Sequence, residues 1–193
     1  MNRRALLAGT TATLGTALAG CTALGGERSL GQPREELDAN GREKHLVFER
    51  NGKSVVTITL QQRTAAQNLP GRFGLRVVIS HSENTNINKF SFELRAPPTS
   101  VEPPAEIYLK QPDGGPWPPI DFQRTENEWT RIAVDDLGDL GRGTLGLETI
   151  VAPLGDSVEA VGVRPDLTLG TTGLLSGGPL RAETQTEFEP VVE

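Results

Sequence analysis

The sequence predicts an all-β protein whose folded part is a single antiparallel β-sandwich of about nine or ten strands. Short runs of alternating apolar and polar residues recur from residue 43 to the C-terminus. Gly and Pro interrupt these runs about every ten residues, and no ten-residue window carries a helical stripe of apolar positions. Alternation gives each run one apolar and one polar face, as an antiparallel sheet with one wet side requires. Evenly spaced short strands are typical of a sandwich.

The first two strands are expected to form a hairpin. Asn51-Gly52 separates the runs 45–50 and 54–61, and both turn residues readily adopt positive φ. In the second run Val56, Ile58 and Leu60 alternate with threonines. Further alternating runs are Leu75/Val77/Ile79, Phe90/Phe92/Leu94, Ile107/Leu109, Ile120/Phe122, Ile132/Val134, Leu145/Leu147/Val151, Val161/Val163 and Ala182/Thr184/Thr186/Phe188.

A Gly/Asp-rich corner joins two of these runs, from Val134 to Leu147. It resembles the corner before the penultimate strand of immunoglobulin-like sandwiches, although the Tyr and Cys of the antibody-type corner are absent. The resemblance implies an immunoglobulin-like arrangement. In the last run Arg181, Glu183, Glu187 and Glu189 form a charged outer face that would guard an edge against pairing with other chains.

The N-terminal residues have the features of an export and lipidation signal. Arg3 and Arg4 precede an uncharged stretch of small residues, which is too short to span a bilayer stably. The stretch ends in Leu18-Ala19-Gly20-Cys21, which resembles the lipobox of secreted lipoproteins, and the paired arginines resemble a Tat signal. The resemblance implies cleavage before Cys21 and a lipid on its thiol. We therefore expect a signal peptide over residues 1–20, a lipid-anchored flexible tether over 21–41 and the sandwich over 42–193.

Composition restricts the classes of partner. The chain has 19 basic and 25 acidic residues, and removal of the leader would leave a net charge of −8. This balance argues against nucleic acid and against electrostatic docking on anionic lipid. A single Cys excludes an internal disulfide and a Cys-rich zinc site. The low Lys content and the leader resemble the small Tat-exported lipoproteins of halophilic archaea whose function is unassigned, and that resemblance implies location alone.

A proline-rich segment supplies the candidate partner-binding residues. Eight of the 14 prolines fall between residues 97 and 119, and Pro116, Trp117, Pro118 and Pro119 lie together. Stiff loops lose little entropy on binding, and Trp is a frequent interface anchor. The alternative interpretation is that these prolines end strands and that Trp117 covers the core of its own domain.

Other candidate sites have weaker patterns. Asp135, Asp136 and Asp139 suggest a calcium site, although Asp in turns commonly bonds its own backbone. A copper site is excluded, because the only Cys is in the lipobox and the only Met is the first residue. His81 could serve a hydrolase, but no GxSxG motif accompanies it. No catalytic residue, cofactor or firm metal site is assigned.

These observations predict a lipid-anchored module on the extracytoplasmic face of the membrane. We expect it to bind or support an envelope protein or complex without catalysis. The alternative function is a secreted hydrolase that uses carboxylates on loops of the sandwich.

Overall fold

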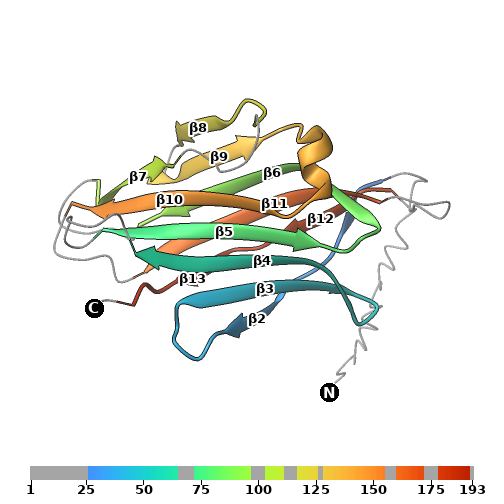
Figure 1. Cartoon of the computed structure of the whole chain (residues 1–193), viewed down its shortest axis with the longest axis horizontal. Helices are drawn as coiled ribbons and strands as arrows, with labels where there is room; N and C mark the ends of the chain where they lie inside the picture. Colours follow the sequence, from blue (N-terminus) through green and yellow to red (C-terminus); the bar gives the residue numbers. More distant parts are fainter. Residues whose placement is uncertain are drawn as a thin grey trace, which may run out of the picture.

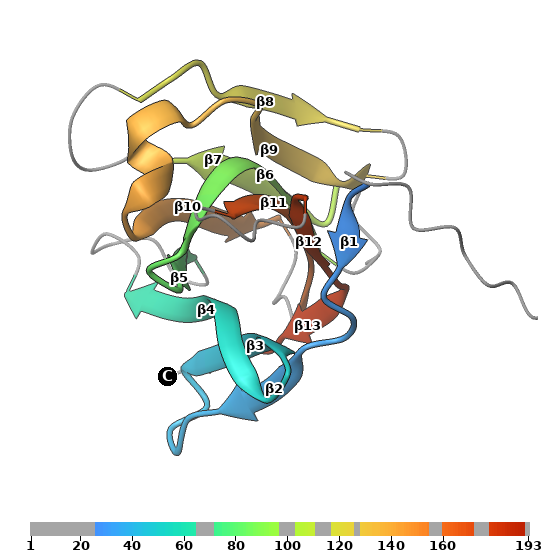
Figure 2. The same cartoon turned by 90° about the vertical axis from the view of Figure 1, so that its right-hand side faces the viewer.

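The computed structural model describes residues 26–64, 72–96, 103–110, 117–125, 128–154, 160–171 and 178–191. Two sheets face each other across a hydrophobic core (Figures 1 and 2), and the predicted all-β sandwich is confirmed. The leader residues Arg3, Arg4 and Leu18–Cys21 lie outside the described residues. The described part of the chain holds thirteen strands and one short 3₁₀ helix, η2 (Gly138–Arg142).

Sheet I has the strand order β1-β12-β11-β6-β9-β8, and β13 also pairs with β11. Its pairs are antiparallel except for β1 and β12, which run parallel. The strands are β1 (Arg28–Ser29), β6 (Thr85–Arg95), β8 (Asp121–Arg124), β9 (Thr130–Val134), β11 (Val161–Thr171), β12 (Leu180–Glu183) and β13 (Thr186–Phe188).

Sheet II has the strand order β2-β3-β4-β5-β10-β7, and all its pairs are antiparallel. The strands are β2 (Arg34–Leu37), β3 (Glu43–Arg50), β4 (Lys53–Thr64), β5 (Phe73–His81), β7 (Ala105–Leu109) and β10 (Leu145–Pro153). Asn51 and Gly52 have φ of 54° and 72°, so the predicted hairpin turn between β3 and β4 is confirmed.

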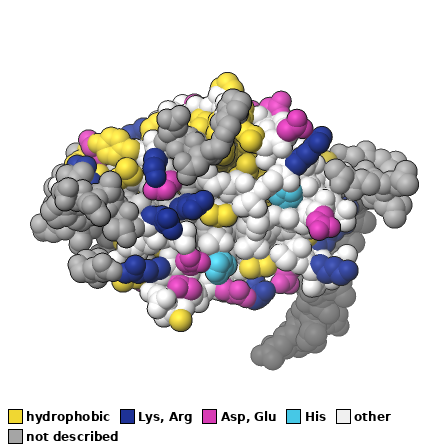
Figure 3. All heavy atoms as spheres, in the orientation of Figure 1, with side chains coloured by type: hydrophobic (Ala, Val, Ile, Leu, Met, Phe, Trp, Pro, Cys, Tyr) yellow, Lys and Arg dark blue, Asp and Glu magenta, His cyan; other side chains and the backbone are white. Residues whose placement is uncertain are grey.

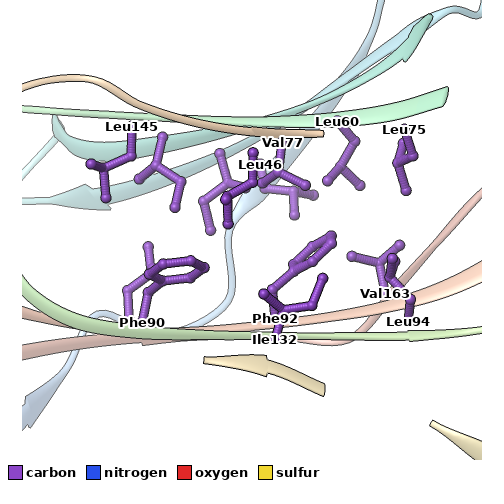
Figure 4. Packing of buried hydrophobic residues seen from close by; sticks show 14 of the residues in the cluster. Leu46, Leu60, Leu75, Val77, Phe90, Phe92, Leu94, Ile132, Leu145 and Val163 are labelled. Atoms are coloured by element: carbon purple, nitrogen blue, oxygen red, sulfur yellow. The ribbon is translucent and has the colours of Figure 1, made fainter. Parts of the chain in front are cut away.

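The apolar positions of the alternating runs meet between the sheets. Phe90, Phe92 and Ile132 of sheet I point toward Leu46, Leu60, Leu75 and Val77 of sheet II (Figure 4). Each of these side chains is at most 2% exposed. Burial of each such side chain contributes about 1.5–3 kcal/mol, so this layer is the main favourable term in folding.

The strand count differs from the predicted nine or ten for two reasons. The last predicted strand is split into β12 and β13, which keep one register against β11 but are interrupted opposite Pro165. Proline lacks the backbone N–H that would continue the ladder there. Two further strands, β1 and β2, lie in the segment that we predicted as a flexible tether.

The predicted tether over residues 21–41 therefore needs correction. β1 pairs with β12, and β2 pairs with β3, so residues 28–29 and 34–37 belong to the sheets. Little in the local pattern indicates this, because β2 consists of Arg-Glu-Glu-Leu and all four residues are exposed. A strand at the edge of a sheet can carry charges on both faces, and such charges hinder pairing with other chains.

The strand order also differs from that of an immunoglobulin domain. β2, β3, β4 and β5 are four consecutive neighbours in one sheet, whereas an immunoglobulin domain has strands A, B, E and D in one sheet and C, F and G in the other. The predicted corner is nevertheless a crossing between sheets, because it joins β9 of sheet I to β10 of sheet II. Within it, η2 packs on β6: the N–H of Leu137 donates to the carbonyl of Asn88, and Gly141 is buried against Ile87.

Candidate functional site

One long side of the sandwich is closed by the C-terminal segment. Lys44 of β3 donates its Nζ to the carbonyl of Glu187 at 2.6 Å and to Thr186 Oγ1 at 3.2 Å, which joins sheet II to β13. Gln62 of β4 exchanges two hydrogen bonds with the backbone of Val191, at 2.7 and 2.8 Å. These contacts tie the two sheets together along this side.

The opposite long side carries a hollow between the outermost strands, β7 of sheet II and β8 of sheet I. Its volume is about 290 Å³, and its lining includes Tyr108, Phe122, Arg124 and Glu128. Tyr108 and Phe122 are 46% and 43% exposed, and Leu154, which follows β10, is 45% exposed. Three of the four large apolar side chains that are exposed in the described residues thus lie at this side.

Figure 3 shows the same distribution. Hydrophobic side chains gather along the upper edge of the view, where β7, β8 and β9 lie in Figure 1, whereas charged side chains of both signs dominate the lower half. We call the surface formed by Glu106, Tyr108, Phe122, Arg124 and Glu128 the β7–β8 surface. Exposed apolar groups gathered at one place on a polar protein favour a contact surface.

The polar groups of the β7–β8 surface are paired with each other. The Tyr108 hydroxyl donates a hydrogen bond to the Glu106 carboxylate, and this bond raises the pKa of the Tyr108 phenol above its ordinary value. Arg124 lies 3.7 Å from Glu128. Glu128 has φ of 66°, in the left-handed region, which costs roughly 1–2 kcal/mol for a side chain with a Cβ.

The outer face of sheet I carries a charge-compensated network around a second hollow of about 370 Å³. Arg164 and Arg95 lie over the ring of the buried Trp129, at 3.9 and 4.9 Å from its centre. Arg181 bonds both carboxylate oxygens of Asp166 at 2.9 Å, and this pairing raises the pKa of Arg181 above its ordinary value. Each charge here has a partner within the domain, so the network has the features of a structural one.

The structure separates the two interpretations of Trp117 only in part. Trp117 is half-buried and packs against the hydrophobic core, as the alternative interpretation expects. Pro118 is half-buried, Pro119 is exposed, and Pro116 lies outside the described residues. A partner-binding role of this segment stays a prediction, and Trp117 does not line the β7–β8 hollow.

The three candidate calcium ligands do not converge. Asp136 Oδ1 accepts a hydrogen bond from Gly138 N at 3.0 Å, which is the turn-forming role expected of such an Asp. Asp139 lies 3.5 Å from Arg142, and Asp135 is exposed. Within the described ranges, no group of three or more His, Cys, Asp or Glu side chains is placed to hold a metal ion.

Both histidines contact threonine hydroxyls near their own strands. His81 Nδ1 lies 3.0 Å from Thr85 Oγ1 and 3.1 Å from the carbonyl oxygen of Ser82, in the turn between β5 and β6. His45 Nδ1 lies 3.0 Å from Thr59 Oγ1. These contacts give the histidines local structural roles.

Comparison with known proteins places the folded part of the chain in a family. A family model described as "Domain of unknown function (DUF8121)" matches residues 27–192. The chain belongs to this family. The match begins one residue before β1, so the DUF8121 domain includes the two N-terminal strands that we had predicted as tether. No curated protein matches the sequence.

Two solved structures are similar at low TM-scores. One, titled "AvmM Catalyzes Macrocyclization in Alchivemycin A Biosynthesis", is 15% identical with a TM-score of 0.31, over 77% of this chain and 96% of that chain. The other, whose title names manganese lipoxygenase of Gaeumannomyces graminis and zonadhesin of Komagataella pastoris, is 10% identical with a TM-score of 0.32, over 82% and 71%. Likenesses of this size carry no argument about function. In the described part of this chain, no helix is long and apolar enough to cross a membrane.

The β7–β8 surface was missed by the sequence reasoning. The run around Ile107 was interpreted only through Ile107 and Leu109, which are partly buried on its inward face. Tyr108 on the polar face of that run was the available signal, because a large aromatic side chain there must lie in solvent or contact something else. Phe122 was assigned with Ile120 to the apolar face of its strand, and this is wrong, because Phe122 is 43% exposed.

Proposed function

We propose that this DUF8121 protein is a lipid-anchored, non-catalytic module on the extracytoplasmic face of the membrane. The module presents the β7–β8 surface to a protein of the cell envelope. The observation that carries this proposal is the gathering of exposed apolar groups on the β7–β8 side of the sandwich, at the edge of the sheets opposite the N-terminal strand β1.

The anchoring half of the proposal rests on the leader. Arg3, Arg4 and the Leu18–Cys21 motif would direct export and lipidation. β1 begins at Arg28, only seven residues after Cys21. Seven residues span at most about 25 Å, so a lipid on Cys21 would keep the N-terminal end of the sandwich close to the bilayer. Stable attachment by this route needs more than one acyl chain or a second signal.

The docking half rests on where the strands run. Arg28 of β1 pairs with Leu180 of β12, and Leu180 pairs with Leu169 of β11. Leu169 in turn pairs with Ile87 of β6, so Arg28 and Ile87 lie at the same height along the strands. Ala96, which lines the β7–β8 hollow, lies nine residues farther along the same strand direction. At 3.3 Å per residue this separation is about 30 Å. In Figure 1 the blue start of the described chain accordingly lies toward the right, while β7 lies at the left.

The polar lining favours docking over catalysis. Glu106 and Glu128 are the two carboxylates of the hollow, and each already has a partner, in Tyr108 and Arg124. Exposed aromatic side chains with a paired, charged rim are the composition of a protein contact surface.

Fractionation of native cells tests the anchor. The full chain should sediment with membranes, and Cys21→Ser should shift the mature protein to the soluble extracytoplasmic fraction or leave uncut precursor. Arg3→Lys/Arg4→Lys should retain the protein inside the cell. A wild-type chain that stays in the cytoplasm would refute the proposed location.

Cross-linked capture from native membranes tests the docking surface. Tyr108→Ser/Phe122→Ser should lose the captured partner while the protein remains folded and membrane-bound. Leu37→Ser is the matched control, because Leu37 is a large apolar side chain 63% exposed on β2, at the other edge of sheet II. Equal capture by wild type and the double variant would refute this surface.

A further inference from the structure

We propose that the open edge of β7 pairs antiparallel with β7 of a second copy of this chain, so that two anchored sandwiches join through sheet II. This inference names the partner that the β7 edge of the proposed docking surface takes, and it rests on the proposed anchoring. Two features of β7 support this pairing: the edge toward which each residue directs its backbone groups, and the order of its side chains.

The pairing of β7 with β10 fixes which residues of β7 direct their backbone N–H and C=O groups to each edge of the strand. The N–H of Lys110 donates to the carbonyl of Glu148, and the carbonyl of Pro104 accepts from the N–H of Leu154, both in register with the β7–β10 ladder. Even-numbered residues of β7 therefore direct their backbone groups toward β10. Ala105, Ile107 and Leu109 direct theirs to the other edge, with which no strand of the described residues pairs and where a second strand would add.

The side-chain order of β7 is self-complementary about Ile107. When two copies pair antiparallel with Ile107 opposite Ile107, all five residues of both strands overlap. Ala105 then lies opposite Leu109 of the second copy, on the face that packs against the core. Up to about six backbone hydrogen bonds close the pair, since the residues that bond are the odd-numbered ones.

The outer face of the same register brings unlike groups together. Glu106 lies opposite Tyr108 of the second copy, in a position where the ladder makes no hydrogen bonds and side chains approach most closely. Within one chain the Tyr108 hydroxyl already bonds Glu106, and both side chains are exposed. The pairing gathers two carboxylates and two phenols into one cluster with no carboxylate directly opposite another.

The other sheet edges are less suited to such pairing. β2 carries Glu35 and Glu36 at its centre, so a strand-on-strand pair about either residue places a glutamate opposite itself. β1 has two residues. β8 has four residues, and its two charged end residues are already in ion pairs: Asp121 lies 2.8 Å from Arg131, and Arg124 lies 3.7 Å from Glu128.

Anchoring makes a small interface sufficient. A five-residue strand pair buries less area than the roughly 1,200–2,000 Å² of a standard interface between proteins free in solution. The antiparallel pair turns the N-terminal ends of the two sandwiches in opposite directions along β7, so both lipid anchors reach one membrane when the strands lie along its surface. Two chains held on that surface meet at a raised effective concentration, which lowers the translational cost of association.

Paired cysteines test the register in the full chain in its native membrane. The only native Cys is Cys21, in the lipobox. Glu106→Cys/Tyr108→Cys should give disulfide-linked dimers on mild oxidation, because each new thiol faces its counterpart across the edge. In each single variant, the Cα atom of the new cysteine lies about 8 Å from the Cα atom of the same residue in the second copy. This distance is too long for a disulfide, so cross-linking should fall at least about fivefold relative to the double variant. Glu35→Cys/Leu37→Cys on β2 is the matched control and should not cross-link.

A charge exchange tests the same contact without covalent trapping. Tyr108→Glu should weaken self-association about tenfold, because carboxylates would then oppose each other at two places. Adding Glu106→Lys to that variant should restore self-association, since the introduced lysine of one copy would face the introduced glutamate of the other. Self-association of the single and the double variant is measured by chemical cross-linking of the membrane-bound protein.

The outcomes separate this inference from the proposed function. Dimers from the double cysteine variant, with rescue by the charge exchange, support the β7 pair. The β7 pair is overturned if no dimer forms, if Tyr108→Cys alone cross-links as much as the double variant, or if a different protein is captured at these positions. Membrane attachment through Cys21 would still support the proposed anchor in each of these cases. Loss of membrane attachment in the wild type overturns the anchor itself.

Discussion

Gly141 should be the least replaceable glycine of the crossing between the two sheets. A Cβ built on Gly141 lies 1.9 Å from the carbonyl oxygen of Ile87, where real contacts do not fall below 3.0 Å. The obstacle is backbone, so η2 or β6 would have to move by about 1 Å. Ile87 is held by its pairing with Leu169 of β11, and β6 also pairs with β9 from Phe90 onward, so this pairing resists the movement.

We expect Gly141→Ala to destabilise the domain by about 3 kcal/mol, at the upper end of the cost of overpacking a close-packed interior. For a domain of this length that loss lowers the melting temperature by roughly 6–12 °C. The assay is thermal unfolding of the purified chain, followed by circular dichroism at a fixed salt concentration. Chemical unfolding checks that the transition remains cooperative.

Gly143→Ala is the matched control in the same connection. Its backbone is extended, and the nearest atom to a new Cβ is the Leu140 carbonyl oxygen at 4.0 Å. We expect its melting temperature to stay within about 2 °C of the wild type. If Gly141→Ala unfolds at the same temperature as Gly143→Ala, η2 does not pack closely against β6.

Three further predictions concern contacts that hold the sandwich together. Asp38 accepts hydrogen bonds from the N–H of Glu43 at 2.8 Å and of Asn40 at 3.3 Å, and the Glu43 bond lowers its pKa below the ordinary 3.8. Because the pKa of Asp38 is lower in the folded state, its carboxylate stabilises the fold above about pH 4, and this stabilisation is lost as the pH falls through the folded pKa. The melting temperatures of wild type and Asp38→Asn should therefore differ near neutral pH and converge in acid below the folded pKa. A difference that stays constant with pH would contradict this prediction. Arg164→Ala should lower the free energy of unfolding by about 1 kcal/mol and shift the fluorescence emission of Trp129 to longer wavelength, since the guanidinium lies over the indole at 3.9 Å. Trp117→Phe, introduced into both wild type and Arg164→Ala, leaves Trp129 as the source of the emission. An unchanged spectrum would show that Arg164 does not shield Trp129. Lys44→Met should lower the free energy of unfolding by about 1–2 kcal/mol and speed the amide hydrogen exchange of residues 186–191, because it removes the hydrogen bond to the Glu187 carbonyl. Lys53→Met in the exposed hairpin is the control. Unchanged exchange would show that Lys44 does not hold the C-terminal segment against sheet II.

Local pattern was sufficient for the strands that bury one face. The runs around Val56, Val77 and Phe92 became β4, β5 and β6 with the predicted residues inside, because alternation alone decides which side chains leave water. Asn51-Gly52 was sufficient for its hairpin, since the turn depends on the φ preferences of two adjacent residues.

Edges and splits depended on neighbours that sequence pattern does not specify. β2 is a strand because β3 pairs with it, and its Arg-Glu-Glu-Leu sequence has no alternation to reveal that. The last run divides into β12 and β13 because Pro165 lies opposite the break, which requires knowledge of the register with β11.

The sequence by itself determined the sandwich class, the hairpin and the buried face of each long strand, because these follow from the period of the side chains and from local backbone preference. Only the tertiary structure decided which strands are outermost and which aromatic side chains remain in solvent. Phe122 holds an apolar position of an alternating run, yet it lies 43% exposed on the β7–β8 side, whereas Trp117 in the proline-rich segment packs on the core. That difference is set by strand order, which arises from contacts between residues far apart along the chain.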